Sequence, residues 1–254
     1  MRLGQNFLRD PNLLDAIVRD AGVEQGECVL EVGPGEGPLT ERLAAVAGTV
    51  HAIELDRSLE PDLEGVAALP GVELIFGDAL DVDLASLEPP PSAMVANLPY
   101  SVAVPVILKT LFELPTLKRW TVMVQREIAD RLAAGPGGRQ YGIPSAILQR
   151  SAAVKVVRKV GREVFDPRPR VESAVISIER TGPAPDPDYV ALVRAGFAHR
   201  RKSLARSVET ARPGSLALVK EALAAEGLDE SVRAERLGPD EFGRLADRIG
   251  PLPG

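Results

Sequence analysis

The sequence predicts an α/β protein in which a doubly wound, mostly parallel sheet is followed by a small C-terminal helical domain. Three observations favour this fold class. Short apolar segments alternate with helix-like segments along residues 12–124. A glycine-rich turn at 33–37 joins one apolar segment to a helix-like one. A Pro-rich run at 182–187, which can propagate neither helix nor sheet, precedes three further helix-like segments.

The individual elements follow from local signals. A helix is predicted at 12–21, because apolar side chains recur at helical spacing after Asp10-Pro11, a capping residue followed by a proline. The other expected helices run through 40–44, 189–209, 215–226 and 240–249. Apolar runs predict strands at 28–32, 49–54, 72–76, 93–96, 119–124, 153–160 and 171–180. The resulting division is a sheet domain at 1–182, a linker at 183–187 and a helical domain at 188–254.

Composition narrows the class of protein. The chain has 254 residues, of which 45% are hydrophobic, so a substantial core is available and disorder is not expected. No apolar run reaches the roughly 18 residues that a membrane span needs, and the N-terminus does not resemble a signal peptide. The single Cys28 fits a reducing cytosol, and the two distant histidines, His51 and His199, make a zinc site improbable. A cytoplasmic protein without a metal site is therefore expected.

Charge is segregated along the chain although the net charge is −6. Residues 1–108 carry 5 Lys and Arg against 18 Asp and Glu, whereas residues 109–206 carry 19 against 9. A basic middle segment can bind a phosphate backbone even when the whole molecule is acidic. The alternative is a thinly spread set of solvated arginines.

The run Asn97-Leu98-Pro99-Tyr100 follows the apolar segment at 93–96. The Asn97 amide oxygen and a backbone carbonyl are hydrogen-bond acceptors, and Tyr100 offers a stacking surface. Pro99 restricts its own φ and the backbone of Leu98, so the carbonyl direction is set before a ligand binds. Such a run suits recognition of a planar ring and its exocyclic amine, although a strand end followed by a proline turn is the plain alternative.

The glycine turn has acidic neighbours. Glu31 precedes it and Glu36 lies within it, so a pyrophosphate bound there would meet carboxylates as well as helix amides. S-adenosylmethionine, which carries a sulfonium and an amine and no phosphate, suits these acids better. Glu54 ends the next predicted strand at the usual distance for a ribose-binding acid, and Asp78, after the third, could accept the adenine amine. The carboxyl ends of successive strands are where open α/β sheets bind ligands.

These features together resemble one known family, the ribosomal RNA adenine N6-dimethyltransferases, and within it the small-subunit (16S) branch. Eight segments carry the resemblance in the expected order over nearly the whole chain: LGQNFL at 3–8, EVGPGEGPLT at 31–40, ELD at 54–56, GDAL at 77–80, NLPY at 97–100, FDPRPRVES at 165–173, FAHRRKSL at 197–204 and RAERL at 233–237. The resemblance implies the class I methyltransferase fold, with a Rossmann-like sheet and a C-terminal helical domain that contacts RNA. It also implies dimethylation of N6 on adjacent adenines during ribosome biogenesis.

The resemblance carries specific site residues. Residues implied to line the S-adenosylmethionine site are Gln5, Asn6, Leu8, Gly33, Gly35, Glu54, Leu55, Asp78, Ala79 and Asn97. The catalytic set is Asn97, Leu98, Pro99 and Tyr100, with Phe165 as a second stacking ring. For Phe165 the spacing alone leaves a core residue equally open. Phosphate contacts are expected at Arg168, Arg170, Arg194, Arg200, Arg201, Lys202 and Arg206, though some of these could instead tie the two domains together. The expected partner is ribosomal RNA in the small subunit, bound by a monomer.

Three alternatives stay open at this point. The first is the large-subunit (23S) branch that confers macrolide resistance, which uses the same kind of amine-binding run as Asn97–Tyr100. The acidic net charge and the segment at 233–237 argue against this branch. A non-catalytic assembly factor could keep the cofactor as a structural ligand, and the intact run at 97–100 argues against lost activity. An NAD-dependent oxidoreductase fits poorly, because no catalytic His or Tyr-x-x-x-Lys pair accompanies the glycine turn.

Overall fold

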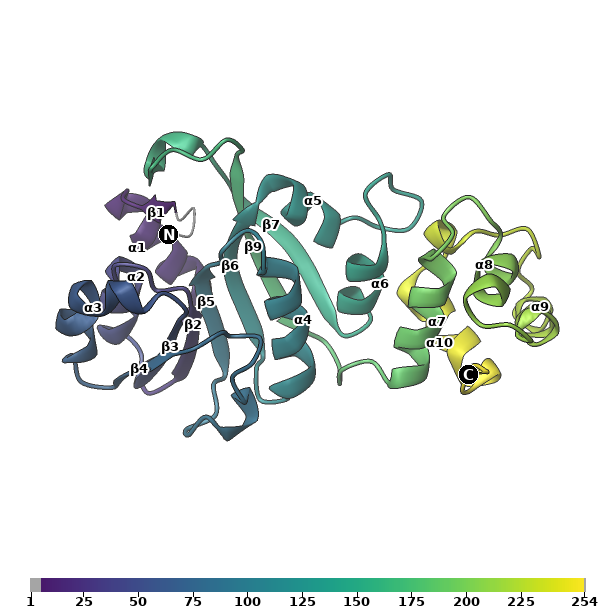
Figure 1. Ribbon diagram of the computed structural model, residues 1–254, viewed down its shortest axis with the longest axis horizontal. Coiled ribbons are helices and arrows are strands. Elements are labelled where there is room, and N and C mark those ends of the chain that lie inside the picture. The colour runs from purple at the N-terminus through teal and green to yellow at the C-terminus, as the bar shows by residue number, and fades with distance from the viewer. Residues whose placement is uncertain (1–5, 254) are drawn as a thin grey trace. The chain divides into compact units, whose positions relative to one another are not determined.

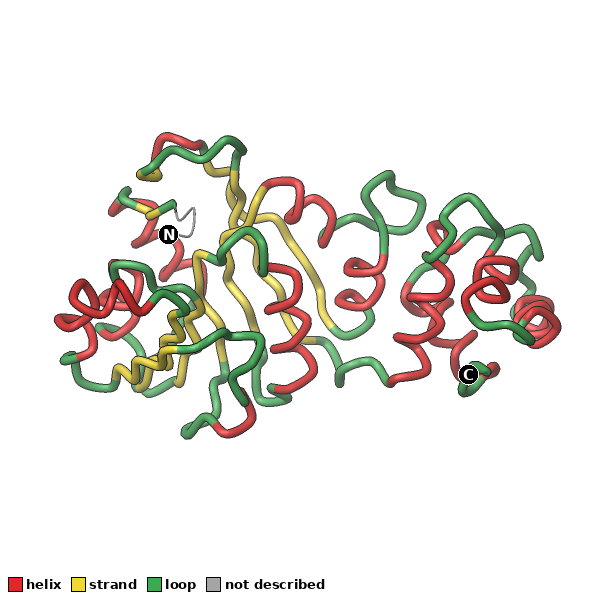
Figure 2. Tube along the Cα trace, viewed as in Figure 1, coloured by secondary structure: helices red, strands yellow, loops and turns green. Residues whose placement is uncertain are grey.

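The computed structural model describes residues 6–253 and divides into two compact units. One unit comprises the described residues up to Ala129 together with Ala153–Arg180, and the other comprises Asp130–Ala152 and the described residues from Thr181 onward. The first unit carries the sheet and the second is built from helices (Figures 1 and 2). Within residues 6–253, no helix combines the length and the apolar character needed to cross a membrane.

The strands are β1 Phe7–Leu8, β2 Cys28–Val32, β3 Thr49–Glu54, β4 Val72–Phe76, β5 Ala93–Asn97, β6 Arg119–Gln125, β7 Ala152–Val160, β8 Phe165–Asp166 and β9 Ser173–Arg180. The α-helices are α1 Pro11–Ala21, α2 Pro38–Ala44, α3 Glu60–Ala67, α4 Ala103–Glu113, α5 Arg126–Leu132, α6 Ile143–Gln149, α7 Pro187–Phe197, α8 Leu204–Ala211, α9 Leu216–Ala225 and α10 Pro239–Ile249. Short 3-10 turns lie at Arg57–Leu59, Leu84–Ser86, Arg162–Val164 and Ala234–Arg236.

The main sheet confirms the predicted α/β class. Its strand order is β4-β3-β2-β5-β6-β9-β7, with β2 to β6 mutually parallel and β9 antiparallel to β6. The chain winds outward from β2 to β4 on one side and from β5 to β6 on the other, so the winding reverses between β2 and β5. A ligand site is expected outside the carboxyl ends of the strands at such a reversal.

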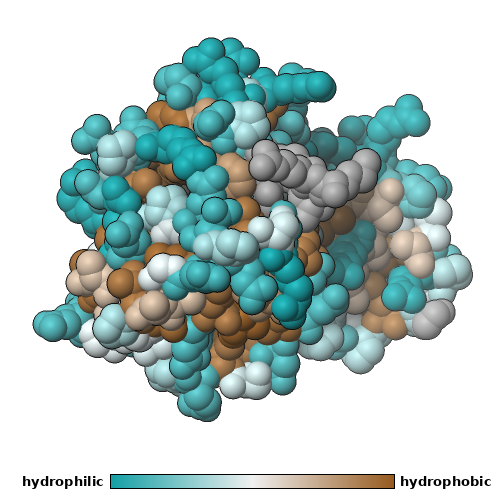
Figure 3. Space-filling model, turned by 60° about the vertical axis from the view of Figure 1, so that its left-hand side comes forward, coloured by the Kyte–Doolittle hydropathy of each residue, from teal (hydrophilic) through white to brown (hydrophobic). Residues whose placement is uncertain are grey.

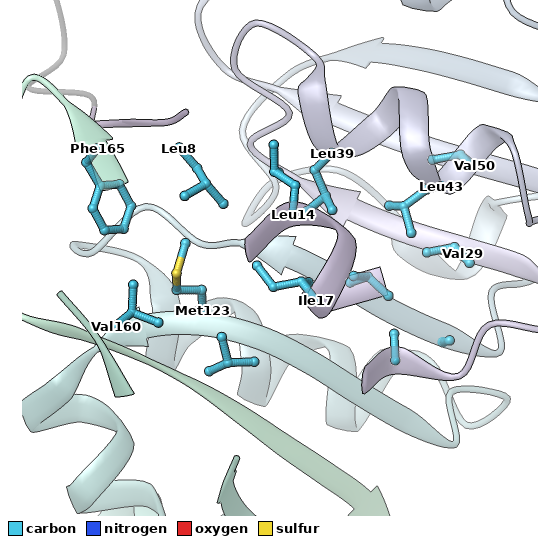
Figure 4. Packing of buried hydrophobic residues seen from close by; sticks show 14 residues of the cluster. Leu8, Leu14, Ile17, Val29, Leu39, Leu43, Val50, Met123, Val160 and Phe165 are labelled. Atoms are coloured by element: carbon cyan, nitrogen blue, oxygen red, sulfur yellow. The ribbon is translucent and has the colours of Figure 1, made fainter. Parts of the chain in front are cut away.

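Local signals account for the first helix. The Asp10 side chain accepts a hydrogen bond from the Leu13 N–H at 2.9 Å, and Pro11 occupies the first turn. The helix ends at Gly22, whose φ of +55° is left-handed. Helix α1 packs on β5, β6 and β9, and Leu14 and Ile17 from it enter a hydrophobic core cluster with strand residues (Figure 4).

The predicted helix at 189–209 is wrong, because two helices, α7 and α8, lie there with a break at residues 198–203. The Ser207 hydroxyl accepts a hydrogen bond from the His199 N–H at 3.1 Å and donates to the Ala195 carbonyl at 2.8 Å. The Leu204 N–H donates to the Val232 carbonyl at 2.7 Å. The backbone groups freed by the break are thus satisfied from elsewhere in the helical unit, which local sequence signals do not show.

The division between the units also differs from the predicted one at 182, because residues 130–152 belong to the helical unit. The Tyr189 hydroxyl donates to the Ala146 carbonyl at 2.8 Å. The ring of Tyr141 lies edge-on to Phe197, with 5.9 Å between their centroids. These long-range contacts make 130–152 part of a helical core, although the segment lies between two strands of the sheet in sequence.

Candidate active site

A cavity of about 470 Å³ opens at the carboxyl ends of β2, β3, β4 and β5, the position expected from the winding of the sheet. Twelve of the residues predicted for cofactor binding and catalysis line it: Asn6, Leu8, Gly33, Gly35, Glu54, Leu55, Asp78, Ala79, Asn97, Leu98, Pro99 and Tyr100. Gln5 lies outside the described residues. The structure therefore brings together five segments that are far apart in the sequence.

The glycine turn between β2 and α2 forms one wall of the cavity. Gly33 has a φ of +76° and Gly35 a φ of +63°, conformations that side-chain-bearing residues rarely adopt. The Gly33 N–H donates to the Ile53 carbonyl at 2.9 Å, which ties the turn to β3. Because neither residue has a side chain, bare backbone faces the cavity and a ligand can lie directly against it.

Glu54 at the end of β3 is held by the backbone around it. One carboxylate oxygen accepts a hydrogen bond from the Gly35 N–H at 3.0 Å, and the other accepts from the Asp56 N–H at 2.8 Å. The side chain is buried and has one orientation between these two donors. Each oxygen keeps a lone pair, so the carboxylate can accept further hydrogen bonds from a ligand that carries two hydroxyl groups.

Glu31 at the end of β2 lines the cavity with a carboxyl group that lacks a full set of partners. It is 1% exposed, and among the described residues its Oε2 atom has no hydrogen-bond partner. Burial raises the pKa of this carboxyl to about 8; the Thr40 hydroxyl opposes the shift and the negative charge of Glu54 adds to it. In the ligand-free protein this carboxyl is therefore mostly protonated at neutral pH, and a positive charge that enters the cavity would favour its ionised form.

Asp78 follows β4 and shapes the turn that leads away from it. Its carboxylate accepts a hydrogen bond from the Leu80 N–H at 2.8 Å, and the Gly77 N–H donates to the Glu54 carbonyl at 2.9 Å. The exposed Leu55 lies on the same side of the cavity and is 55% exposed. Figure 3 shows apolar side chains reaching the surface of this unit among hydrophilic ones.

The Asn97–Tyr100 segment forms another wall of the cavity. The Leu98 N–H donates to the Met123 carbonyl at 3.0 Å, and the Leu98 side chain is buried. The Val102 N–H then donates to the Pro99 carbonyl at 3.1 Å, which closes the turn into α4. No hydrogen bond within residues 6–253 engages the Asn97 amide, so this amide is available to a ligand.

Phe165 lies outside the cavity, contrary to its predicted role there. It was predicted as a second stacking ring, but it is 5% exposed and does not line the cavity. Its backbone pairs with Leu8 in the antiparallel ladder of β1 and β8, and its ring packs in the cluster that holds Leu8, Met123 and Val160 (Figure 4). In this conformation the ring is a core element that anchors the segment 6–8 beside the cavity.

The predicted phosphate contacts lie in both units. Arg168 and Arg170 are exposed in the sheet unit, and the other five are exposed in the helical unit. Arg200 is partly committed to its own unit, because it pairs with Glu235 at 3.0 Å and donates to the Arg139 carbonyl at 2.7 Å. The Lys202 ammonium donates to the Thr210 hydroxyl at 2.9 Å. Within residues 6–253, no ion pair engages the exposed Arg194, Arg201 or Arg206, so their guanidinium groups are available to a phosphate.

Two residues of the site escaped the sequence analysis. Phe7 lines the cavity, and a β-carbon placed on Gly35 would stand 3.1 Å from its ring. Ser173 contacts Tyr100 through its hydroxyl. Both lie inside segments that carry the family resemblance, which was the available signal. Local sequence could not show which of their neighbours they touch.

The fold and the site together define a Rossmann-like methyltransferase. The parallel strands wind outward on both sides of β2 and β5, the glycine turn follows β2, and a backbone-anchored acid ends β3. In two solved structures the same fold covers nearly the whole chain. A dimethyladenosine transferase from Plasmodium falciparum matches 97% of this chain and 99% of its own at a TM-score of 0.78 and 22% identity. The 23S rRNA methyltransferase ErmE matches 96% and 99% at a TM-score of 0.69 and 28% identity.

The family model for ribosomal RNA adenine dimethylase matches residues 1–250, and the chain belongs to this family. Curated relatives are similar over nearly their full length. Ribosomal RNA small subunit methyltransferase A of Rubrobacter xylanophilus is 43% identical over 255 residues, which cover 98% of this chain and 95% of the relative. The protein of the same name from Kineococcus radiotolerans is 46% identical over 255 residues, covering 96% and 84%. The predicted family resemblance is confirmed.

Proposed function

We propose that this protein uses S-adenosyl-L-methionine to dimethylate N6 of adjacent adenines in small-subunit (16S) ribosomal RNA, as a step of ribosome biogenesis. The observation that carries the proposal is one cavity lined by both the acid-rich glycine turn and the Asn97–Tyr100 segment. Two curated relatives that this chain matches over 95% and 84% of their own length are named small-subunit methyltransferases, and this supports the choice of RNA. The protein would act in the cytoplasm as a monomer.

The acidic and acceptor groups that line the cavity suit S-adenosylmethionine. The unpartnered Glu31 carboxyl can ionise opposite a cationic group, Glu54 can accept from ribose hydroxyls, and Asp78 can accept from an adenine amine. Bare backbone at Gly33 and Gly35 leaves room for close approach, and about 470 Å³ lies within the usual range for small-molecule sites. When bound, the cofactor supplies an electrophilic methyl group.

Asn97 and Leu98 would orient the target amine. The exocyclic nitrogen of adenine is a poor nucleophile because its lone pair is delocalised into the ring. If the Asn97 amide oxygen and the Leu98 carbonyl accept its two hydrogens, the nitrogen can pyramidalise and present the lone pair to the cavity. Alkylation makes this nitrogen acidic, so its proton leaves to a carbonyl or to water without a strong base.

Catalysis in this scheme comes mainly from alignment, an effect that can supply roughly 7–11 kcal/mol of a barrier. The target base must leave its stack, which costs a few kcal/mol, and stacking on Tyr100 offsets this by about 1–3 kcal/mol. The exposed arginines would hold the phosphate backbone, with Arg168 and Arg170 in the sheet unit and Arg194, Arg201 and Arg206 in the helical unit.

The test is methyl transfer from labelled S-adenosylmethionine to separated, unmethylated small and large ribosomal subunits. We expect label in the small subunit and dimethyladenosine after nuclease digestion and mass detection. An Asn97→Ala variant should lose transfer while it keeps the fold, as judged by thermal unfolding. Label confined to the large subunit, or no label at all, would contradict the proposal.

A further inference from the structure

The hydroxyl groups of Tyr100 and Ser173 are 2.7 Å apart and form a hydrogen bond. Tyr100 lines the cavity and is half-buried, whereas Ser173 is 1% exposed. Ser173 is the first residue of β9 and pairs with Gln125, the last residue of β6. Because β6 lies between β5 and β9 in the sheet, the turn after β5 and the Tyr100 side chain together connect the end of β5 to the start of β9.

This hydrogen bond restrains the far end of the Tyr100 side chain. Its near end is set by the turn at Pro99, which α4 continues. A phenol held at both ends has its long axis fixed, so its hydroxyl is directed to Ser173 and its ring is placed beside the cavity before a ligand arrives. Burial raises the pKa of the Tyr100 hydroxyl, with the Ser173 hydrogen bond opposing the shift, so the phenol remains a neutral group.

We propose that Ser173 is a positioning residue, whose buried hydroxyl holds Tyr100 so that the ring face, and not the phenol oxygen, meets an unpaired purine base. This inference rests on the proposed function, and it deepens that function by giving Tyr100 a geometric role. The segment 165–173 thereby serves the site through its last residue, while Phe165 packs in the core. In this role the hydrogen bond to Tyr100 needs a hydroxyl at position 173, and the rest of the side chain takes no part in it.

The first experiment does not depend on activity. The chain has three tyrosines, so 3-fluorotyrosine labelling gives three fluorine resonances, and Tyr100→Phe identifies the one from Tyr100. Ser173→Ala should change the shift and linewidth of that resonance and leave those of Tyr141 and Tyr189 in place. An unchanged Tyr100 resonance would overturn the contact itself, whether or not the protein methylates RNA.

The second experiment measures kcat and KM for small-subunit methylation, together with the cofactor dissociation constant by calorimetry. Loss of one neutral hydrogen bond predicts an approximately 3- to 10-fold lower kcat for Ser173→Ala and for Tyr100→Phe. The loss should fall on kcat, because phosphate contacts dominate RNA affinity. Cofactor affinity should stay within about twofold, since Ser173 does not line the cavity proposed to hold the cofactor. The double variant should be no slower than either single one.

Two further variants separate positioning from general damage to β9. Ser173→Thr keeps the hydroxyl and should restore kcat, and Ser177→Ala removes a serine from the same strand and should behave as wild type. Full activity of Tyr100→Phe, or defects that multiply in the double variant, would overturn the proposal. So would a Tyr100→Phe defect far larger than that of Ser173→Ala, because the phenol would then act on the substrate directly. If the wild-type protein transfers no methyl group while the fluorine result holds, the proposed function fails and the contact stands.

Discussion

Gly33 lies against Pro99, because a β-carbon on Gly33 would stand 3.2 Å from the Cγ and Cδ atoms of the Pro99 ring. The two residues belong to the turns that follow β2 and β5, the strands between which the winding of the sheet reverses. The turn proposed to hold the cofactor and the turn proposed to hold the target base are therefore in van der Waals contact. A substitution that displaces one of these turns is therefore expected to displace the other.

Gly33→Ala should weaken both cofactor binding and methyl transfer by at least tenfold. The substitution places a side chain in a left-handed conformation, which costs about 1–2 kcal/mol, and pushes it against Pro99. Gly22→Ala is the matched control, because Gly22 is also left-handed and a β-carbon there meets nothing within 4 Å. We expect both variants to lose thermal stability, Gly33→Ala by at least as much as Gly22→Ala, and an affinity loss, measured by calorimetry, only at Gly33. Equal affinities would show that the Pro99 contact is unimportant.

Glu31 should make the stability of the ligand-free protein fall as pH rises from about 4.5 to about 8. Over this window the carboxyl ionises in the unfolded chain and stays protonated in the folded one, so the unfolded state is favoured. Each pKa unit of difference corresponds to about 1.4 kcal/mol. Glu31→Gln should abolish this part of the slope, so its urea midpoint should gain on wild type between pH 5 and pH 8.5. A constant difference between the two proteins would contradict the assignment.

Arg180 should be a strong determinant of stability although it lies away from the cavity. Its guanidinium donates to the carbonyls of Leu117 at 2.6 Å and of Leu111 and Leu114 at 3.0 Å, at the end of α4. A lysine cannot reproduce this planar fork, so Arg180→Lys should lower the free energy of unfolding by about 1–3 kcal/mol. Arg158→Lys, at a partly exposed pair in which Asp20 accepts two hydrogen bonds, keeps the positive charge and should cost less than about 1 kcal/mol. Urea denaturation measures both, and similar losses would contradict the prediction.

Arg201 and Arg200 should behave differently although they are adjacent. Arg201 is exposed, and no ion pair within the described part of the chain engages it, so Arg201→Ala should reduce the salt dependence of RNA binding by roughly 0.7 in log–log slope. Arg200→Ala removes the pair with Glu235 and the bond to the Arg139 carbonyl, so it should lower thermal stability as well. Lys220→Ala, at the Lys220–Glu230 ion pair, is the control and should leave the slope unchanged.

Sequence determined the elements whose signals are local. The strands at 28–32, 49–54 and 72–76 lie where the apolar runs predict them. The first two are buried inside the parallel sheet, where strands are apolar on both faces, whereas the third is its partly exposed edge strand. The glycine turn and the acids Glu54 and Asp78 also lie at strand ends as predicted, since the carboxyl ends of parallel strands share one edge. The eight sequence segments that carry the family resemblance, taken in order, were sufficient to identify the family.

Tertiary structure decided what depends on contacts between distant segments. The break between α7 and α8 is stabilised by Val232, residues 130–152 belong to the helical unit because of Tyr189 and Phe197, and Phe165 is buried through its pairing with Leu8. The Tyr100–Ser173 bond spans 73 positions of the chain. Helical spacing and strand alternation report the periodicity of one segment and carry no information about its partner, so only the packed chain reveals these contacts.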